Sequence, residues 1–184
     1  MTSAASVGGD EQLRLFLALR LPDDVLDEIE LWQRTQLRSI RGVPREHLHV
    51  TIAFLGHRPA GELDSIVGGL RDAAAAVSGE IRLKPLRYRE TRSVGMLVLD
   101  DEEGRAALLT EDVQKRLEKL GVYRREGRPW LPHLTVARWR ERPRLHLDPP
   151  SVRTFVPSDA AAYLSRLHPG GARYEVLESV ALGG

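Results

Sequence analysis

The chain has 184 residues, 42% of them hydrophobic and 29% charged, with a formal net charge of +1. These values are typical of a globular protein with a sizeable core, and they exclude a broadly basic protein that coats nucleic acid. The absence of cysteine excludes disulfides, thiolate metal sites and a thiol nucleophile. Any contact with nucleic acid therefore requires a local basic cleft.

Residues 1–10 are small and polar, which predicts a disordered tail and lacks the pattern of a signal peptide. No apolar run approaches the ~20 residues that a membrane helix needs. We therefore expect a monomer in the cytoplasm, without membrane association. Its folded part is expected to be a single domain over residues 11–184.

The spacing of apolar residues changes several times along the rest of the chain. Alternate apolar residues predict strands, whereas spacings of three and four predict helices. In chain order, this predicts strand 13–21, helix 22–41, strand 47–56, helix 59–79, strands 81–88 and 94–99, helix 105–120, and strands 132–139, 161–167 and 174–181. The proline-rich passage 143–157 predicts a loop with an edge strand, and residues 168–171 predict a turn.

This order of elements has a weak internal symmetry. Each half contains a helix followed by a strand that carries the same short motif. The pattern predicts an α+β (mixed α/β) fold of two lobes, with the two motif strands lining a shared cleft.

The motif is His-x-Thr, which begins once at His49 and once at His133. Side chains two apart in a strand point to the same face, so His49 lies beside Thr51 and His133 beside Thr135. The residue between them is apolar in both cases and faces the opposite way. One such motif is more typical of structural residues, but the repeat favours a catalytic pair.

The pair of motifs has the side chains that displacement at a phosphate needs. Hydrolysis of a phosphodiester requires a base that takes a proton from water and an acid that protonates the departing oxygen. Imidazole, with a reference pKa near ~6.5, serves in either state at neutral pH. Threonine hydroxyls can donate to the non-bridging oxygens and stabilise the developing charge. This chemistry requires neither a metal nor another cofactor.

A metal site is the alternative suggested by His47 and His49, because His-x-His spacing can chelate zinc. The sequence offers no third and fourth ligand at a suitable spacing. We therefore predict no metal, and place His47 at the edge of the cleft.

Two arginines near the second motif are candidates for binding the substrate. Strict alternation turns Arg138 away from His133 and Thr135, unless a twist or bulge in the strand lets the guanidinium reach the phosphate. Arg128 lies in the segment leading to the same motif. Trp130 could stack on a base, although packing is the more common use of such a residue. The sequence leaves these alternatives open.

The longer segments HLHVTIAFLG (47–56) and PHLTVAR (132–138) resemble the paired signatures of the two-histidine phosphoesterase superfamily. The whole layout is similar to that of bacterial and archaeal RNA 2',3'-cyclic phosphodiesterases, once called 2'-5' RNA ligases. Weaker agreement extends over RLFLALRLP (14–22) and LSRLHPGGARYEVL (164–177). The chain departs from the family pattern at His47, an additional imidazole, and at Ala53, where a polar or basic residue is common.

The resemblance implies a bilobal fold in which two antiparallel β-sheets line a central cleft and the helices pack outside. It also implies metal-free hydrolysis of 2',3'-cyclic phosphate ends of RNA, or of cyclic nucleotides, to a 2'-phosphate. His49 would donate a proton to the departing 3'-oxygen, His133 would activate water, and Thr51 and Thr135 would hold the phosphate oxygens. Because the motifs are nearly symmetric, the two histidine roles can also be exchanged.

Three alternatives remain open at this point. The same site could join RNA ends as a 2'-5' RNA ligase, or cleave 2'-5' oligonucleotide linkages. The protein could also bind phosphorylated RNA ends without processing them.

Overall fold

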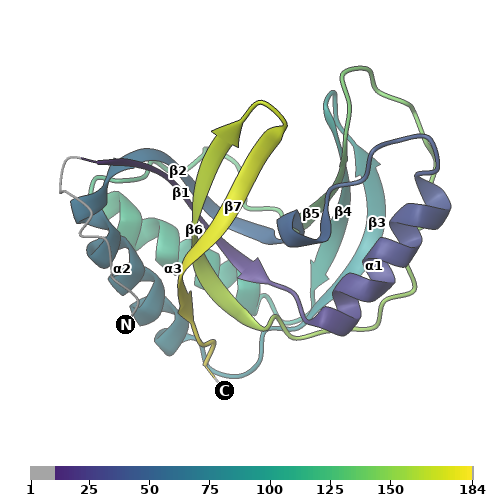
Figure 1. Ribbon diagram of the computed structural model, residues 1–184. Coiled ribbons are helices and arrows are strands. Elements are labelled where there is room, and N and C mark those ends of the chain that lie inside the picture. The colour runs from purple at the N-terminus through teal and green to yellow at the C-terminus, as the bar shows by residue number, and fades with distance from the viewer. Residues whose placement is uncertain (1–10, 184) are drawn as a thin grey trace, which may run out of the picture.

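Seven strands form one antiparallel sheet in the order β3-β4-β5-β2-β1-β6-β7 (Figure 1). The structure is a computed structural model that describes residues 11–183, and the tail expected at 1–10 lies outside them. The strands are β1 (Gln12–Arg20), β2 (Val50–Pro59), β3 (Leu83–Glu90), β4 (Val94–Asp101), β5 (His133–Arg138), β6 (Asp159–His168) and β7 (Gly171–Val180). The helices are α1 (Asp23–Gln36), α2 (Leu63–Ala76) and α3 (Arg105–Lys119).

The expectation of two separate β-sheets is wrong, because one continuous sheet runs through both lobes. The lobes meet where β2 pairs with β5, and the only registered partners in this pairing are Val50 and Leu134. By contrast, β1 pairs with β2 along nearly its whole length. A short backbone pairing at the starts of β2 and β5 therefore joins two groups of strands into one sheet.

Helices α1 and α3 each pack against the lobe that does not contain the strand preceding them, so the two halves of the chain interlock. Helix α1 follows β1, yet it packs against the lobe formed by β3, β4 and β5 (Figure 1). Its Trp32 ring lies 5.9 Å from the ring of Tyr88 in β3, and Gln33 donates to the carbonyl of Val136 in β5. Helix α3 follows β4 but lies beside α2, against β2 of the other lobe.

The alternation of side chains in the strands decides which face the helices cover. In β1, Leu15, Leu17 and Leu19 are buried in the large core beneath the helices. Phe16 points the other way and joins Tyr163 of β6 in a small cluster. The face opposite the helices is therefore covered only locally, and it is the concave side of the sheet (Figure 1).

Several element bounds differ by a few residues from those predicted, and β2, for example, begins at Val50 rather than at residue 47. Two differences concern the end of α1 and the proline-rich passage. Helix α1 ends at Gln36 rather than near residue 41, because the backbone that follows runs alongside β5: the N–H of Val43 donates to the carbonyl of Val136 at 2.9 Å. The proline-rich passage has a single bridge, Leu83 with Phe155, where an edge strand was expected. In the described part of the chain, no helix is both long and apolar enough to cross a membrane.

Candidate active site

The two His-x-Thr motifs meet at the seam between β2 and β5. Val50 and Leu134, the central residues of the motifs, are antiparallel partners there. Extending this register by one residue in either direction places His49 opposite Thr135 and Thr51 opposite His133. Opposed residues in such a pair hold their Cβ atoms about 4.5–5.5 Å apart. Each imidazole therefore stands beside the hydroxyl of the other motif.

A cavity of about 280 Å³ covers this seam on the concave face of the sheet. Its lining brings together five of the six residues singled out from the sequence: His49, Thr51, His133, Thr135 and Arg138. The rest of the wall comes from the segment before β2, from the β6–β7 turn and from two aromatic rings: Arg41, Gly42, Val43, Pro44, His47, Gly170, Gly171, Ala172 and Tyr174.

Arg138 reaches the cavity because β5 contains a bulge. Strand β4 pairs Met96 with Thr135 and Val94 with Arg138, which leaves Val136 as an extra residue in β5. Val94 and Met96 are two apart in a regular strand and share a face, so their partners Thr135 and Arg138 share that face too. The bulge resolves the alternative that the sequence left open, and it places a guanidinium beside the histidine pair.

His133 is held in one ring orientation by the backbone. Its Nδ1 lies 2.8 Å from the carbonyl oxygen of Leu131. A carbonyl only accepts hydrogen bonds, so Nδ1 carries the proton in the neutral ring and Nε2 is left as an acceptor. This tautomer suits a group that takes a proton from water.

The imidazole of His49 lies on an aromatic floor. Its ring centroid is 4.9 Å from that of Phe16, 5.8 Å from that of Tyr163 and 5.7 Å from that of Tyr174. These rings come from β1, β6 and β7, the strands on the far side of β2 from His133. The ring keeps part of its surface open to the cavity but is otherwise enclosed.

This enclosure changes the charge state of His49. Desolvation by burial is the largest effect and lowers its pKa to about 4. The backbone of His47 opposes this in part, although no described atom reaches Nδ1 of His49 in good hydrogen-bond geometry. Positive charge on His47, Arg138 and His133 lowers the pKa further. Without a bound anion, His49 is therefore neutral at pH 7.

His47 and Tyr174 belong to the cavity wall although no role was assigned to either from the sequence. Their ring centroids are 4.3 Å apart. Desolvation lowers the pKa of His47 as well, and Arg138 adds to the effect. The His-x-His spacing was a signal for His47, but nothing in the spacing of the sequence pointed to Tyr174.

Arg128 is the one candidate that the structure does not bring to the histidine cavity. Its guanidinium pairs with Glu126 at 2.6 Å, and 81% of the side chain is exposed. It lines a neighbouring cavity of about 540 Å³, which shares Thr51 and His133 with the first. Trp130 also lines this second cavity and donates its indole N–H to the carbonyl of Thr51 at 3.0 Å.

Within residues 11–183, no three side chains of His, Cys, Asp or Glu gather in an arrangement that could hold a metal ion. The cavity at the seam is lined by two imidazoles, two hydroxyls and a guanidinium, and its volume of about 280 Å³ is large enough for a phosphate.

Comparison with known protein families identifies the family of this chain. The model of the 2'-5' RNA ligase superfamily matches residues 21–168, a span that includes both motifs. The chain belongs to the 2'-5' RNA ligase superfamily.

Two relatives in this superfamily are similar over almost their full length. An RNA 2',3'-cyclic phosphodiesterase of Thermus thermophilus is 32% identical, covering 94% of this chain and 91% of the relative. A protein of the same name from Methanocaldococcus jannaschii is 25% identical, covering 90% and 99%. Among solved structures of the superfamily, Escherichia coli LigT complexed with 3'-AMP superposes with a TM-score of 0.80 at 21% identity, covering 95% of this chain and all of that one.

Proposed function

We propose that this protein is an RNA 2',3'-cyclic phosphodiesterase that hydrolyses cyclic phosphate ends to 2'-phosphates by metal-free acid–base catalysis. The observation that carries the proposal is the register of Val50 with Leu134, which sets two imidazoles and two hydroxyls around one small cavity. Both relatives described above bear this activity in their names, and LigT was crystallised with 3'-AMP, a nucleotide with a phosphate on its ribose.

The reaction follows from the positions of these groups. Nε2 of His133 takes a proton from water, and the water oxygen forms a bond to phosphorus. The bond from phosphorus to the 3'-oxygen breaks, and His49 gives its proton to that oxygen. The product carries a 2'-phosphate and a 3'-hydroxyl, and exchange of protons with solvent returns both imidazoles to their initial states.

Thr51, Thr135 and Arg138 act on the phosphate itself. Each hydroxyl can donate to a non-bridging oxygen, on which negative charge grows as the fifth bond to phosphorus forms. The guanidinium of Arg138 supplies positive charge on the same face. Arg128 is outside this set, and its place in the second cavity suits a contact with another part of the substrate.

The neutral state of His49 constrains its role as the acid. A ring with a pKa of about 4 is neutral at pH 7 and lacks the second ring proton that an acid must give up. A cyclic phosphate carries a negative charge, and an anion within a few ångströms raises the pKa of an imidazole. Binding of the substrate is therefore the event that protonates His49. The exchanged assignment, with neutral His49 as the base and His133 as the acid, is the second candidate because the same low pKa favours it.

The test is the identity of the product. A dinucleotide ending in a 2',3'-cyclic phosphate is incubated with the protein, and the position of the phosphate is determined by 31P NMR. We expect a 2'-phosphate only, formed at the same rate in the presence of EDTA. A 3'-phosphate, no turnover or loss of activity with the chelator would each contradict the proposal.

A further inference from the structure

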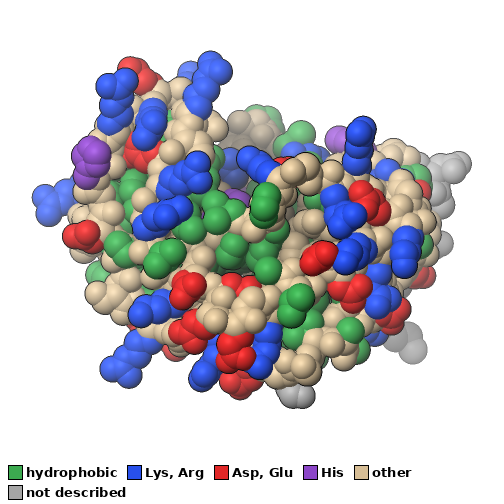
Figure 2. All heavy atoms as spheres, turned by 180° about the vertical axis from the view of Figure 1, so that it is seen from behind, with side chains coloured by type: hydrophobic (Ala, Val, Ile, Leu, Met, Phe, Trp, Pro, Cys, Tyr) green, Lys and Arg blue, Asp and Glu red, His purple; other side chains and the backbone are tan. Residues whose placement is uncertain are grey.

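The charge of the chain is concentrated on one projecting part of the second lobe. Residues 86–93 and 138–146, which we call the basic arm, contain seven arginines and two glutamates. The arm therefore carries a net charge of +5 in a chain whose net charge is +1, so the remaining residues sum to −4. All seven arginines are exposed. Figure 2 shows Lys and Arg side chains gathered on this projecting part, at the upper left.

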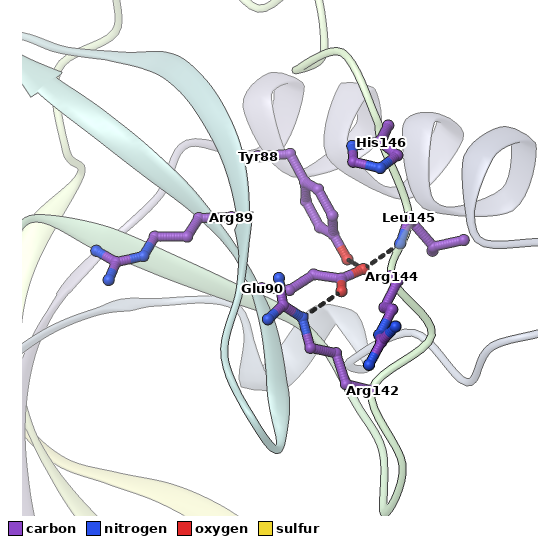
Figure 3. A pocket seen from close by; sticks show the side chains of 7 residues that line it. All are labelled: Tyr88, Arg89, Glu90, Arg142, Arg144, Leu145 and His146. Carbon is purple, nitrogen blue, oxygen red and sulfur yellow. Dashed lines mark hydrogen bonds and ion pairs between the residues drawn. The ribbon is translucent and has the colours of Figure 1, made fainter.

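The two segments of the arm are fastened to each other. Glu90 is nearly fully buried and accepts hydrogen bonds from the Tyr88 hydroxyl, from Nε of Arg142 and from the backbone N–H of Leu145 (Figure 3). Burial acts to raise the pKa of Glu90, but these hydrogen bonds outweigh it and leave the pKa below its usual value. The carboxylate therefore stays charged and holds the loop after β5 against β3.

A second contact closes the tip of the arm. The backbone N–H of Trp139 donates to the carbonyl of Ser93, and its indole N–H donates to that of Arg92. Gly95 permits this packing, because a Cβ there would lie 2.6 Å from the Tyr88 hydroxyl and 2.8 Å from the Trp139 ring. The basic arm is thus a defined surface and not a pair of loose loops.

The register of the sheet turns part of this charge toward the active site. Arg87 pairs with Val98, and Val98 pairs with His133. Similarly, Arg89 pairs through Met96 with Thr135. Paired residues share a face, and strands lie about 4.8 Å apart, so each arginine is about 10 Å from its catalytic partner on the same face.

The view in Figure 3 agrees with this assignment of faces. Arg89 points away from the side of β3 that holds Tyr88, Glu90 and Arg142. It lines the cavity of about 540 Å³ that adjoins the histidine pair, together with apolar groups such as Met96. Arg87 and Arg89 on β3 therefore lie on the far side of this cavity from β5, which carries His133.

We propose that the basic arm binds the RNA strand that leads away from the cyclic end. This inference rests on the proposed function, and it names the substrate as an RNA chain several nucleotides long. In such a chain, the next phosphate is attached to the 5' side of the terminal ribose, so the backbone must leave the cavity over one of its walls. The path over β4 to Arg87, Arg89 and the tip of the arm meets a row of positive charge. Phosphate contacts of this kind supply affinity without reading sequence.

The opposite wall of the cavity is a poorer path. The β6–β7 hairpin carries Arg166 and Arg173 near its turn, but Arg166 lies 3.8 Å from Glu175 and a further acid, Glu178, follows in the same strand. In the arm, Arg142 is the one arginine that forms an ion pair with another residue of 11–183. The difference favours the arm as the surface for a polyanion.

The experiment compares adenosine 2',3'-cyclic phosphate with an oligoadenylate of eight nucleotides that ends in the same cyclic phosphate. The arm variant is R87Q/R92Q/R140Q, which spares every residue lining the histidine cavity. The matched control is R82Q/K84Q/R153Q, which removes the same charge from exposed positions at the other end of β3 and beside it. Values of kcat/KM are measured for both substrates over a range of salt concentrations.

For the wild type we expect a higher kcat/KM on the octanucleotide, falling as salt rises. The arm variant should lose on the order of 10-fold on the octanucleotide through KM, with its salt slope reduced by about 2, because each phosphate contact on a single strand contributes about 0.7. Its turnover of the mononucleotide, and both activities of the control, should be unchanged.

Equal kcat/KM on the two substrates in the wild type would overturn the inference, as would equal losses in arm and control variants. Loss of mononucleotide turnover in the arm variant would also overturn it, since the arginines would then serve the reaction or the fold. If the wild type turns over neither substrate, the proposed function fails. Binding to the arm is then measured by fluorescence anisotropy of the labelled octanucleotide. The inference requires a higher Kd for the arm variant than for the control variant.

Discussion

The two halves of the candidate active site carry the same motif in different surroundings. The His49 half lies on a floor of three aromatic rings, which lowers the pKa of this imidazole to about 4. Among residues 11–183, no aromatic rings stack on His133 in this way, and a backbone carbonyl lies 2.8 Å from its Nδ1 instead. Desolvation thus controls the charge state of His49, whereas a hydrogen bond fixes the ring orientation of His133, although both sequences read His-x-Thr.

This difference shows how a nearly symmetric motif can supply unlike groups. An acid and a base must hold different protonation states when the reaction begins. Identical environments would give both imidazoles the same affinity for protons, so the fold must separate them. On the His49 side this comes from residues outside the motif, since the aromatic rings of β1, β6 and β7 enclose the imidazole and desolvation lowers its pKa.

Among tests of the difference between the two halves, removing each imidazole in turn should have the largest effect. We expect H49A and H133A each to lower kcat on a 2',3'-cyclic nucleotide by about 10²–10⁴-fold, because each loses one proton transfer. Circular dichroism should show the same fold as in the wild type. Full activity in the double variant would reject the pair as the catalyst.

A substrate with sulfur in place of the 3'-oxygen separates the two roles. Thiolate leaves without needing a proton, so the acid becomes dispensable while the base does not. With His49 as the acid, H49A should regain most of its activity on this substrate and H133A should not. The reverse result would establish the exchanged assignment.

Removal of the hydroxyls has the next largest effect. T51V and T135V keep the branched shape of the side chain but remove its donor, and each should raise the barrier by about 2–4 kcal/mol if the hydroxyl acts like an oxyanion-hole donor. The loss should appear in kcat more than in KM. T51S and T135S are the controls and should stay near wild-type activity. An equal loss in the serine variants would indicate a role in packing only.

The low pKa of His49 also predicts a dependence of stability on pH. In the unfolded chain this imidazole has a pKa near ~6.5, and in the folded protein it is about 4. The folded state therefore binds fewer protons, so the contribution is fully present above pH 6.5 and is lost as the pH falls from about 6.5 to about 4. It amounts to about 3 kcal/mol in the free energy of unfolding.

Urea denaturation at pH 7 and pH 4 measures this contribution. The wild type should lose more stability between these values than H49Q, which has no group to titrate at this position. An identical loss in both proteins would show that another group causes the acid sensitivity. Inorganic phosphate should reduce the difference, because an anion in the cavity raises the pKa of His49.

The sequence predicted the elements and the chemical groups better than their arrangement. Alternation in residues 13–21 identified β1 and its buried face, since burial of leucines on one side is a local property of the strand. The pairing of β2 with β5 through Val50 and Leu134 is a long-range contact, and no local pattern distinguishes one sheet with a narrow seam from two sheets. The roles of the site residues, the domain division and the monomeric state remain predictions.

Arg138 and Arg128 show why the substrate contacts were harder to predict. Alternation gave the wrong face for Arg138, because an unpaired Val136 shifts the register and only the partner strand β4 reveals it. Arg128 is five residues before His133 in the sequence, but its segment lines a different cavity. Proximity along the chain is a weak guide where the backbone leaves regular structure.

The smallest expected effect concerns the contact between the two halves. Trp130, just before the second motif, donates its indole N–H to the carbonyl of Thr51 in the first. W130F removes this hydrogen bond and should lower the free energy of unfolding by about 1 kcal/mol. Because the bond positions one motif relative to the other, kcat/KM on a cyclic mononucleotide should fall several-fold as well. Trp139 offers a matched control, since its indole donates to a carbonyl in the basic arm. W139F should cost similar stability and leave mononucleotide turnover unchanged; equal losses of turnover in both variants would mean that the Trp130 contact supports the fold alone.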